Sequence, residues 1–400
     1  MIDVDLTIDS GKRIRIMNSP NYFYEFFAGG GMARAGLDSG WKCLFANDFD
    51  YKKVNTYKKN WGNETIVQSD IKTLQCSDLK GAADLVWASF PCQDLSLAGG
   101  GAGLRGERSG TFWPFWDLMK SLVKEKRPPK IIALENVCGA LTSHDGSDFS
   151  AICSALSESD YSFGALVVDA ALFLPHSRPR LFIIAVHKDC EIPDNLTLSH
   201  SQKSFHTKQL IKAHDLLSER EKSNWIWWSV PLPTINVSKF IDIIEEDSKV
   251  DKWDSPEKTS ELLQMMSDVN LQKVEDAKRS GIRKVGTLYK RTRKDSEGNK
   301  VQRSEVRFDD IAGCLRTPSG GSSRQSILIV EGENIRSRLI SIRETARLMG
   351  LPDSYVLPEN YNEGYHLTGD GVAVPVVRHL ANALFEKILS FNKLNRMDAA

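Results

Sequence analysis

The chain has 400 residues, 41% of them hydrophobic, and its 52 basic and 52 acidic residues cancel to a formal net charge of zero. This length and composition predict roughly two domains with a full hydrophobic core. They exclude a membrane-spanning protein, because no apolar run reaches the length of a span, and the seven cysteines without a C-x-x-C pair exclude a disulfide framework or a zinc ribbon and fit a reducing cytoplasm.

Short apolar runs alternate with amphipathic stretches through the first half of the chain. We expect strands at 22–28, 42–48, 65–70, 84–90, 130–136, 163–170 and 180–186, with helices between most of them, for example at 112–126 and 149–159. This alternation predicts a doubly wound, mostly parallel α/β sheet with helices on both faces. Only the short segment LFLPHSRP separates the last two strands, so we expect that pair to be antiparallel.

From residue 187 to about 325 the sequence is irregular and polar, and its charge is segregated. Residues 240–276 contain 11 acidic and 4 basic residues, whereas residues 278–307 contain 11 basic and 3 acidic residues. Such a basic block is either a solvated surface loop or the local footprint of a nucleic-acid partner that the zero net charge conceals. Helical pattern returns at 340–349 and 374–389.

A glycine-rich turn, FFAGGG at 26–31, follows the first expected strand and precedes a helical segment. Glycines there let the backbone turn sharply and approach a ligand closely. Their spacing is not the dinucleotide pattern G-x-G-x-x-G, which argues against a nicotinamide oxidoreductase. Asp48 and Asp70 end the next two strands, where carboxylates either accept hydrogen bonds from a nucleoside or cap the helices that follow.

A cysteine stands where a hydrophobic strand runs into a loop rich in glycine and serine, in the string Pro91-Cys92-Gln93. A thiol in this place is positioned like a nucleophile, and the alternative is a buried structural thiol. Two further polar strings, ENV at 135–137 and HSRPR at 176–180, lie at the ends of later strands. One thiol, one carboxylate and two arginines at strand ends indicate nucleophilic chemistry on a polar ring. The loop at 93–108 has the glycine content of a hinged lid.

Seven strings, in this order, resemble the DNA cytosine-5 methyltransferases, which use S-adenosylmethionine. They are FFAGGG at 26–31, PCQ at 91–93, GERSGTFW at 106–113, ENV at 135–137, HSRPR at 176–180, RETARLMGLP at 343–352 and GDGVAVP at 369–375. The resemblance implies a Rossmann-like methyltransferase sheet with an antiparallel last strand and a smaller, irregular recognition domain. It implies a catalytic and cofactor-binding domain at 1–186, a target recognition domain at 187–325, and a C-terminal segment at 326–400 whose last helix returns to the catalytic domain.

The resemblance also implies the roles of the catalytic residues. The thiolate of Cys92 adds to carbon 6 of cytosine, and Glu135 holds or protonates ring nitrogen 3. Arg178 binds the 2-oxo group and steadies Glu135, with Arg180 as its partner.

Binding residues follow from the same resemblance. The expected cofactor contacts are Phe27, Ala28, Gly29, Gly31, Asp48, Phe49, Asp70, Ile71, Pro91, Thr111 and Asp370. Among them, Phe49 is expected to stack on adenine and Ile71 to pack on the same ring. The expected DNA contacts are Gln93, Ser96, Lys290, Arg291, Arg293 and Lys294.

The function implied is methylation of carbon 5 of a flipped-out cytosine within a short duplex DNA sequence, through a covalent Cys92 adduct and without a metal. A restriction–modification system in a prokaryotic cytoplasm is the usual setting, with a restriction endonuclease as companion, and a monomer suffices for the chemistry. Two alternatives stay open. One is an RNA (tRNA) cytosine-5 methyltransferase, against which the long variable region argues. The other is an inactive DNA-binding protein, against which the intact catalytic strings argue.

Overall fold

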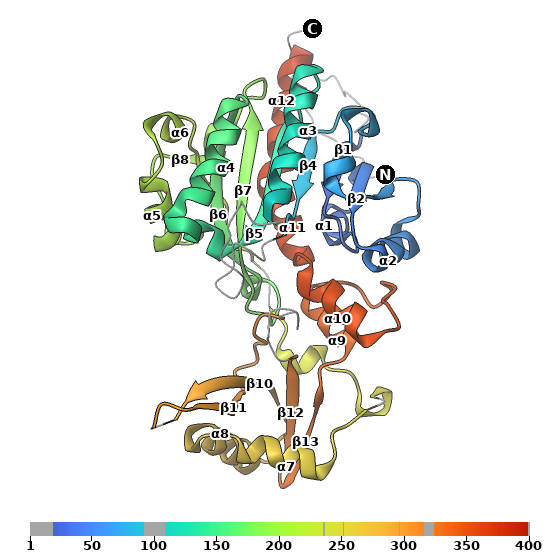
Figure 1. Cartoon of the computed structure of the whole chain (residues 1–400), viewed down its shortest axis with the longest axis vertical. Coiled ribbons are helices and arrows are strands. Elements are labelled where there is room, and N and C mark those ends of the chain that lie inside the picture. The colour runs from blue at the N-terminus through green and yellow to red at the C-terminus, as the bar shows by residue number, and fades with distance from the viewer. Residues whose placement is uncertain are drawn as a thin grey trace, which may run out of the picture.

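The computed structural model describes residues 19–91, 109–234, 237–250, 252–295, 297–315 and 324–398. Cys92, Gln93, Ser96 and the expected lid loop at 93–108 lie outside these ranges. A seven-stranded sheet occupies one end of the long axis of the molecule and a four-stranded sheet the other (Figure 1).

The large sheet confirms the expected fold class. Its strand order is β3-β2-β1-β4-β5-β7-β6, and only β7 runs antiparallel to its neighbours. The strands are β1 (Asn21–Phe26), β2 (Trp41–Asp48), β3 (Ile66–Gln68), β4 (Leu85–Ala88), β5 (Ile131–Val137), β6 (Tyr161–Asp169) and β7 (Pro179–His187). Each lies within a few residues of its expected range, because uninterrupted apolar runs are typical of strands buried on both faces.

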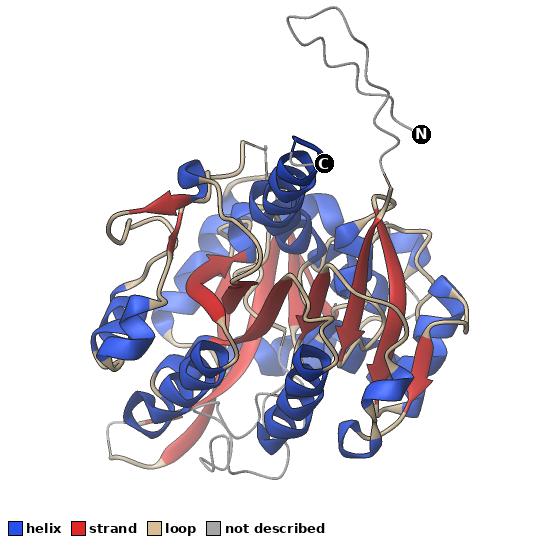
Figure 2. Cartoon of the chain, turned by 90° about the horizontal axis from the view of Figure 1, so that it is seen from above, coloured by secondary structure: helices blue, strands red, loops and turns tan. Residues whose placement is uncertain are grey.

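Helices cover both faces of this sheet (Figure 2). They are α1 (Met32–Leu37), α2 (Tyr51–Trp61), α11 (Val374–Leu380) and α12 (Glu386–Asp398) on one face, and α3 (Phe112–Lys124), α4 (Ser147–Glu158) and α5 (Lys208–Asp215) on the other. Successive side chains of a strand alternate between faces. Accordingly, Trp87 belongs to the first core and its neighbour Val86 to the second.

The C-terminal helices lie against the first helix of the chain. Arg378 Nη1 in α11 donates to the Leu37 carbonyl at 2.5 Å, and Trp41 Nε1 donates to Glu386 Oε1 in α12 at 2.9 Å. A π-helical turn, Ala381–Phe385, joins α11 to α12. The two ends of the chain therefore build one hydrophobic layer.

The small sheet is antiparallel, with the strand order β11-β10-β12-β13. Its strands are β10 (Lys284–Lys294), β11 (Lys300–Arg307), β12 (Ser326–Glu331) and β13 (Asn334–Leu339), and α7 (Pro256–Gln264) and α8 (Asp268–Arg279) pack on one face. The expected boundary at residue 325 falls inside this sheet, because the apolar run SILIVE supplies the inner strand β12.

The start of the expected recognition region packs on the large sheet instead. Trp225 forms a bridge with Phe163 of β6, and its ring lies 5.8 Å from that of Phe163. The elements here are α5, α6 (Glu219–Ser223) and a short pair of strands, β8 (Thr197–Leu198) and β9 (Trp227–Trp228). The second sheet and its helices thus form a unit that starts later than the expected residue 187 and ends later than the expected residue 325.

Two helices, α9 (Ile342–Leu348) and α10 (Tyr361–Asp370), lie between the sheets (Figure 1). An ion pair anchors α9 to β13: Arg338 Nη2 donates to Glu344 Oε1 at 2.6 Å and Nη1 to Oε2 at 2.8 Å, with both side chains fully buried. Trp253 stacks on the Arg338 guanidinium at 5.4 Å. Geometry of this kind fixes how the small sheet joins the helices.

Gly36 is the contact point between α1 and α11, so Gly36→Ala is expected to destabilise the fold. A Cβ there would lie 2.5 Å from the Cβ of Val377 and 2.7 Å from the Val374 carbonyl oxygen. Forcing the helices apart costs about 1–3 kcal/mol. The control is Gly40→Ala, where the nearest atom lies at 3.6 Å and the change should stay within about 0.5 kcal/mol. Urea unfolding measures both, and equal midpoints would contradict the packing.

Candidate active site

The carboxyl ends of the parallel strands meet at one edge of the large sheet, where doubly wound folds bind ligands. The glycine turn after β1 forms the first part of this edge. Phe27, Gly29 and Gly31 all have left-handed backbone angles, with φ of 55°, 54° and 80°. Such a φ is uncommon for phenylalanine, and strained residues cluster at functional sites. A Cβ on Gly29 would meet open space, which leaves a cradle beside the turn.

Two aromatic side chains that the sequence analysis missed hold this turn in place. The carbonyl of Gly30 accepts hydrogen bonds from Trp61 Nε1 at 3.0 Å and from the Tyr355 hydroxyl at 2.6 Å. A Cβ on Gly31 would lie 2.4 Å from Trp61 Nε1, so only glycine fits there. Tyr355 comes from the far end of the chain, and no local pattern links it to the turn.

Asp48, at the end of β2, is placed as expected. Its Oδ2 accepts from the Gly29 N–H and its Oδ1 from the Asp50 N–H, both at 2.8 Å. Burial raises the pKa of this carboxyl. The ring of Phe49 beside it is 72% exposed. A carboxylate next to an open aromatic face suits a nucleoside, whose ribose offers hydroxyl donors and whose base offers a stacking surface.

The next pair of expected cofactor residues fits less well. Asp70 caps a 3₁₀ turn, Ile71–Thr73, through the Lys72 N–H at 3.0 Å, as the simpler interpretation of this aspartate predicted. The Ile71 side chain is only 4% exposed and packs in the core with Phe26 and Phe45. It therefore has little surface to offer an adenine ring, because the same side chain is needed to fill the layer beneath the sheet.

The remaining expected cofactor residues lie around the same edge. Ala28 follows the strained Phe27 and donates its N–H to the Asn47 carbonyl at 2.8 Å. Pro91 follows β4, and Thr111 precedes the first residue of α3. Asp370 ends α10 and forms an ion pair at 2.7 Å with Lys53 of α2, a residue that the sequence analysis did not single out.

Glu25 is a further candidate that the sequence analysis missed. Its Oε1 accepts from the Arg34 N–H in the first turn of α1 at 3.3 Å, and its Oε2 is buried without a partner among the described residues. Burial outweighs the bonds from the helix and raises the pKa of this carboxyl to about 8. A buried, unsatisfied acid with a shifted pKa is typical of functional sites. The signal in the sequence is a lone acid inside the apolar run FYEFF.

The expected catalytic carboxylate is paired with an arginine. Glu135, near the end of β5, is 6% exposed, and its Oε1 lies 3.3 Å from Arg180 Nε of β7. Next to it, Asn136 Nδ2 donates to the Phe90 carbonyl at 3.2 Å. Phe90 immediately precedes Pro91, so this bond ties the root of the cysteine-bearing loop to the strand that carries Glu135.

The roles expected for the two arginines need a correction. Arg180, not Arg178, contacts Glu135. Arg178 is 2% exposed, and its guanidinium donates to the carbonyls of Gly369 and Gly371, each at 2.7 Å. These bonds occupy Arg178 because a buried guanidinium must satisfy its donors. Sequence spacing alone cannot distinguish two arginines two residues apart on the same strand end.

His176 links three segments of the fold through its ring. Its Nδ1 lies 2.9 Å from the Leu348 carbonyl of α9, and its Nε2 accepts from the Leu315 N–H at 3.4 Å. Complete burial lowers its pKa to about 3, so the ring is neutral and bridges one acceptor and one donor.

The expected DNA contacts that the structure describes belong to the small sheet. Lys290, Arg291, Arg293 and Lys294 all belong to β10 of the small sheet, and all four are exposed. The structure therefore separates the basic residues from the catalytic pair and places them on the second unit.

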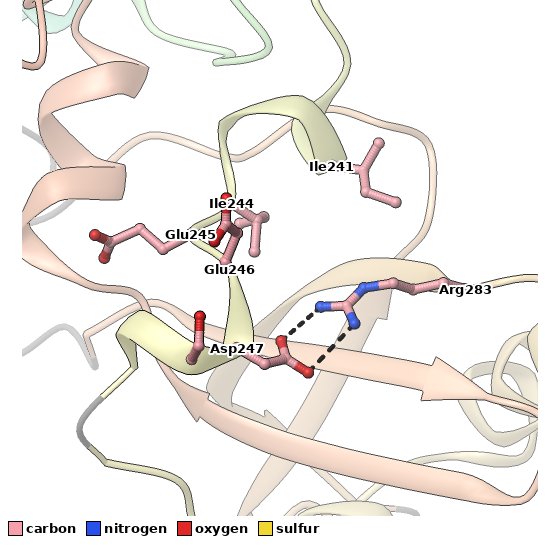
Figure 3. Close-up of a pocket in the computed structure, with 7 residues that line it drawn as sticks. Ile241, Ile244, Glu245, Glu246, Asp247 and Arg283 are labelled. Carbon is pink, nitrogen blue, oxygen red and sulfur yellow. Dashed lines mark hydrogen bonds and ion pairs between the residues drawn. The ribbon is translucent and has the colours of Figure 1, made fainter.

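A separate hollow of about 480 Å³ opens beside the small sheet, lined by Ile241, Ile244, Glu245, Glu246, Asp247, Ser248 and Arg283 (Figure 3). The Arg283 guanidinium grips both oxygens of Asp247, at 2.8 and 3.3 Å. These bonds, with those from Arg336, hold the pKa of Asp247 at about 2. Asp247 and Arg283 thus satisfy one another, Glu246 lies 3.5 Å from Lys249 outside the lining, and we assign no ligand to the hollow.

No group of three or more histidine, cysteine, aspartate or glutamate side chains within the described ranges is placed to hold a metal ion. None of the described helices is long and apolar enough to cross a membrane.

These features define a class of protein: a doubly wound α/β fold whose carboxyl edge brings a buried aspartate and an exposed aromatic ring to the same side as a paired carboxylate and guanidinium. The model of the C-5 cytosine-specific DNA methylase family matches residues 22–386. The chain therefore belongs to this family of methyltransferases, which confirms the resemblance seen in the sequence, and membership implies S-adenosylmethionine as the methyl donor.

Individual relatives agree. The chain is 27% identical over 367 residues to the type II methyltransferase M.HhaI of Haemophilus parahaemolyticus, covering 90% of this chain and 92% of that protein. It is 26% identical over 388 residues to M.HpaII of Haemophilus parainfluenzae, covering 92% and 89%. Among solved structures, the Entamoeba histolytica methyltransferase EhMeth matches with a TM-score of 0.62 at 14% identity, and Dnmt2 of S. pombe with 0.57 at 18%, each covering 92% of this chain and 99% of the other. These two superpositions support the fold.

Glu25 gives a pH-dependent stability. Between the model-peptide pKa of 4.5 and the folded value of about 8, the folded protein keeps a proton that the unfolded chain has lost. Stability attributable to this carboxyl therefore falls as pH rises through that window, by about 1.4 kcal/mol per pH unit. Glu25→Gln removes the effect, so the free energy of unfolding of the variant should rise relative to that of the wild type as the pH increases from 5 to 8.

Chemical denaturation at several pH values measures this difference, with the exposed Glu64→Gln as the matched control. A difference between Glu25→Gln and wild type that stays constant with pH would contradict the raised pKa.

Proposed function

We propose that this protein methylates carbon 5 of a cytosine within a short duplex DNA sequence. The observation that carries the proposal is the contact between Glu135 and Arg180 beside the root of the cysteine loop. A carboxylate and a guanidinium side by side match the hydrogen-bonding edge of cytosine, and the nucleophile expected from the sequence follows Pro91. The printed family description and the type II relatives point to DNA as the substrate.

The residues at the strand ends fit S-adenosylmethionine, which supplies an electrophilic methyl group on a sulfonium. Asp48 is suited to the ribose hydroxyls and the exposed Phe49 to the adenine face. The open space beside Gly29 admits the rest of the molecule. We also assign Phe27, Ala28, Gly31, Asp70, Pro91, Thr111 and Asp370 to this binding region, and Ile71 to its support from below.

Cys92 is the proposed nucleophile. Carbon 5 of cytosine is a poor nucleophile, but adding the Cys92 thiolate to carbon 6 forms a carbon–sulfur bond and moves the π-electron pair to carbon 5. Carbon 5 would then take the methyl group that S-adenosylmethionine supplies, and the methyl–sulfur bond would break to leave S-adenosylhomocysteine. A base then removes the proton of carbon 5, the ring double bond re-forms and the bond from carbon 6 to the Cys92 sulfur breaks to release the thiolate. The ring thereby regains its carbon 5–carbon 6 double bond and carries a methyl group at carbon 5 in place of the proton.

Glu135 and Arg180 hold the ring during this addition. Glu135 engages nitrogen 3 and the adjacent amino group, so that negative charge does not build up on the ring. Arg180, already in contact with Glu135, is placed for the 2-oxo group. Arg178 fixes the start of β7 through its bonds to Gly369 and Gly371, and in this way positions Arg180 of the same strand.

The target carbon is not accessible in a stacked duplex, so the cytosine must leave the stack, at a cost of about a few kcal/mol. We propose that the small sheet and its helices hold the duplex. In this proposal the recognition unit runs from about the start of the 3₁₀ turn Phe240–Ile243 to the end of β13, rather than over 187–325.

Expression in a host without DNA methylation tests the substrate. Base-resolution sequencing for 5-methylcytosine should find one short motif fully methylated. Genomic DNA without 5-methylcytosine, together with methylated transfer RNA, would instead support the RNA enzyme.

Cys92→Ala is expected to abolish methyl transfer while binding of S-adenosylhomocysteine changes by no more than a few fold, because the thiol acts on the ring and not on the cofactor. A duplex with 5-fluorocytosine at the target should form a covalent adduct with the wild type, since a base cannot remove fluorine as it removes a proton. Denaturing electrophoresis detects the adduct. Cys76→Ala, in the 3₁₀ turn Cys76–Asp78 where its Sγ lies 3.4 Å from Arg127 Nη2, is the control and should still form it. An adduct with Cys92→Ala would overturn the mechanism.

A further inference from the structure

The basic strand β10 presents two different faces. Leu288 belongs to the core under α7 and α8, and pairs with the buried Val306 of β11. Because side chains alternate, Lys290 and Lys294 lie on this helix-covered face and Arg291 and Arg293 on the opposite one. The four residues that the sequence groups as one basic block are therefore two pairs of different chemistry on two sides of a sheet.

The arginine face is the one turned toward the large sheet. Figure 1 shows α7 and α8 on the far side of the small sheet from the seven-stranded sheet. Tyr289 shares the arginine face and donates to Gln325 Oε1 at 2.8 Å. A Cβ on Gly313 would lie 2.3 Å from the Tyr289 hydroxyl, and Cys314 Sγ lies 3.5 Å from Arg178 Nη1. The arginine face thus begins beside the catalytic edge.

One carboxylate organises the two arginines. Glu305 of β11 accepts from Arg293 Nε at 2.6 Å through its Oε1, and its Oε2 lies 3.4 Å from Arg291 Nε. The Arg291 guanidinium also lies 5.6 Å from the centre of the Tyr289 ring. The side chains of both arginines are 48% exposed. Arg293 Nη2 also lies 2.5 Å from Glu305 Oε1, so Glu305 holds Arg293 through both Nε and Nη2.

A carboxylate in the middle of a basic face argues against simple attraction to phosphates. Glu305 cancels one of the two positive charges and repels the backbone of a nucleic acid, whereas lysines alone would give phosphate attraction at no such loss. What Glu305 provides is orientation, because an arginine held through Nε loses less side-chain freedom on binding a planar acceptor. The acceptor in duplex DNA that suits such a fork is guanine, with O6 and N7 in the major groove.

We propose that Arg291 and Arg293 read guanine within the methylated sequence, and that Glu305 is the positioning residue that aims them. This inference rests on the proposed DNA substrate and deepens it. Lys290 and Lys294, on the other face, add only sequence-independent attraction. The methylated motif accordingly contains guanine next to or near the target cytosine on one or both strands.

The test uses the full-length protein and a pool of duplexes carrying every sequence context around a cytosine. Methylation of each context is sequenced for the wild type and for three variants: Arg291→Gln/Arg293→Gln, the charge-matched Lys290→Gln/Lys294→Gln, and Glu305→Gln. Binding of S-adenosylhomocysteine verifies that each variant is folded.

The arginine pair should lower the ratio of the cognate motif to motifs with a replaced guanine about tenfold or more. The lysine pair should lower all contexts in parallel. Glu305→Gln should lower the same ratio while making DNA binding fall more steeply with salt, since it removes a negative charge. A merely structural role for Glu305 would instead lower all contexts in parallel and leave this ratio unchanged.

Two outcomes are separable. If the wild type methylates a DNA motif but the arginine and lysine pairs reduce every context by the same factor, the arginines act only through charge and the inference fails while the proposed function stands. A wild type that methylates no duplex of the pool overturns both.

Discussion

A guanidinium buried to 2% exposure needs an acceptor for its donors, because an unpaired buried charge costs several kcal/mol. Arg178 finds acceptors in the carbonyls of Leu315, Gly369 and Gly371, which lie 137, 191 and 193 residues away in the sequence. The start of β7, the segment that follows β11 and the end of α10 are therefore fixed around one side chain. The contact between Glu135 and Arg180 inherits its position from this arrangement, since Arg180 lies two residues further along the same strand.

Contacts between residues far apart in the sequence also join the two ends of the chain at the carboxyl edge of the large sheet. The Gly30 carbonyl is held by Trp61 from one side and by Tyr355 from the other, and Asp370 pairs with Lys53. A turn with left-handed residues keeps its shape only when its surroundings over-determine it. The C-terminal segment supplies part of that surrounding structure. The edge is thus completed by residues that the sequence places more than half the chain away. Beneath it, Oε2 of Glu25 is buried without a partner among the described residues.

Acidic and basic residues are concentrated in different parts of the structure, although the net charge of the chain is zero. The acidic stretch at 240–276 partly compensates arginines of the small sheet: Asp247 pairs with both Arg283 and Arg336. The β10–β11 hairpin keeps its excess of basic residues, tempered on one face by Glu305. A chain of zero net charge thereby presents a localised basic surface, and a carboxylate inside that surface exchanges some attraction for direction.

The sequence by itself determined the large sheet, the antiparallel β7 and the strings at its carboxyl edge, because apolar runs, glycine turns and terminal carboxylates are local patterns. It placed Asp48, Phe49 and Glu135 at that edge. Only the tertiary structure decided which arginine reaches Glu135, that Ile71 faces the core, that β12 and β13 extend the small sheet, and that four basic residues of one strand divide between two faces. Those outcomes depend on burial and on partners distant in the chain, which no local pattern encodes.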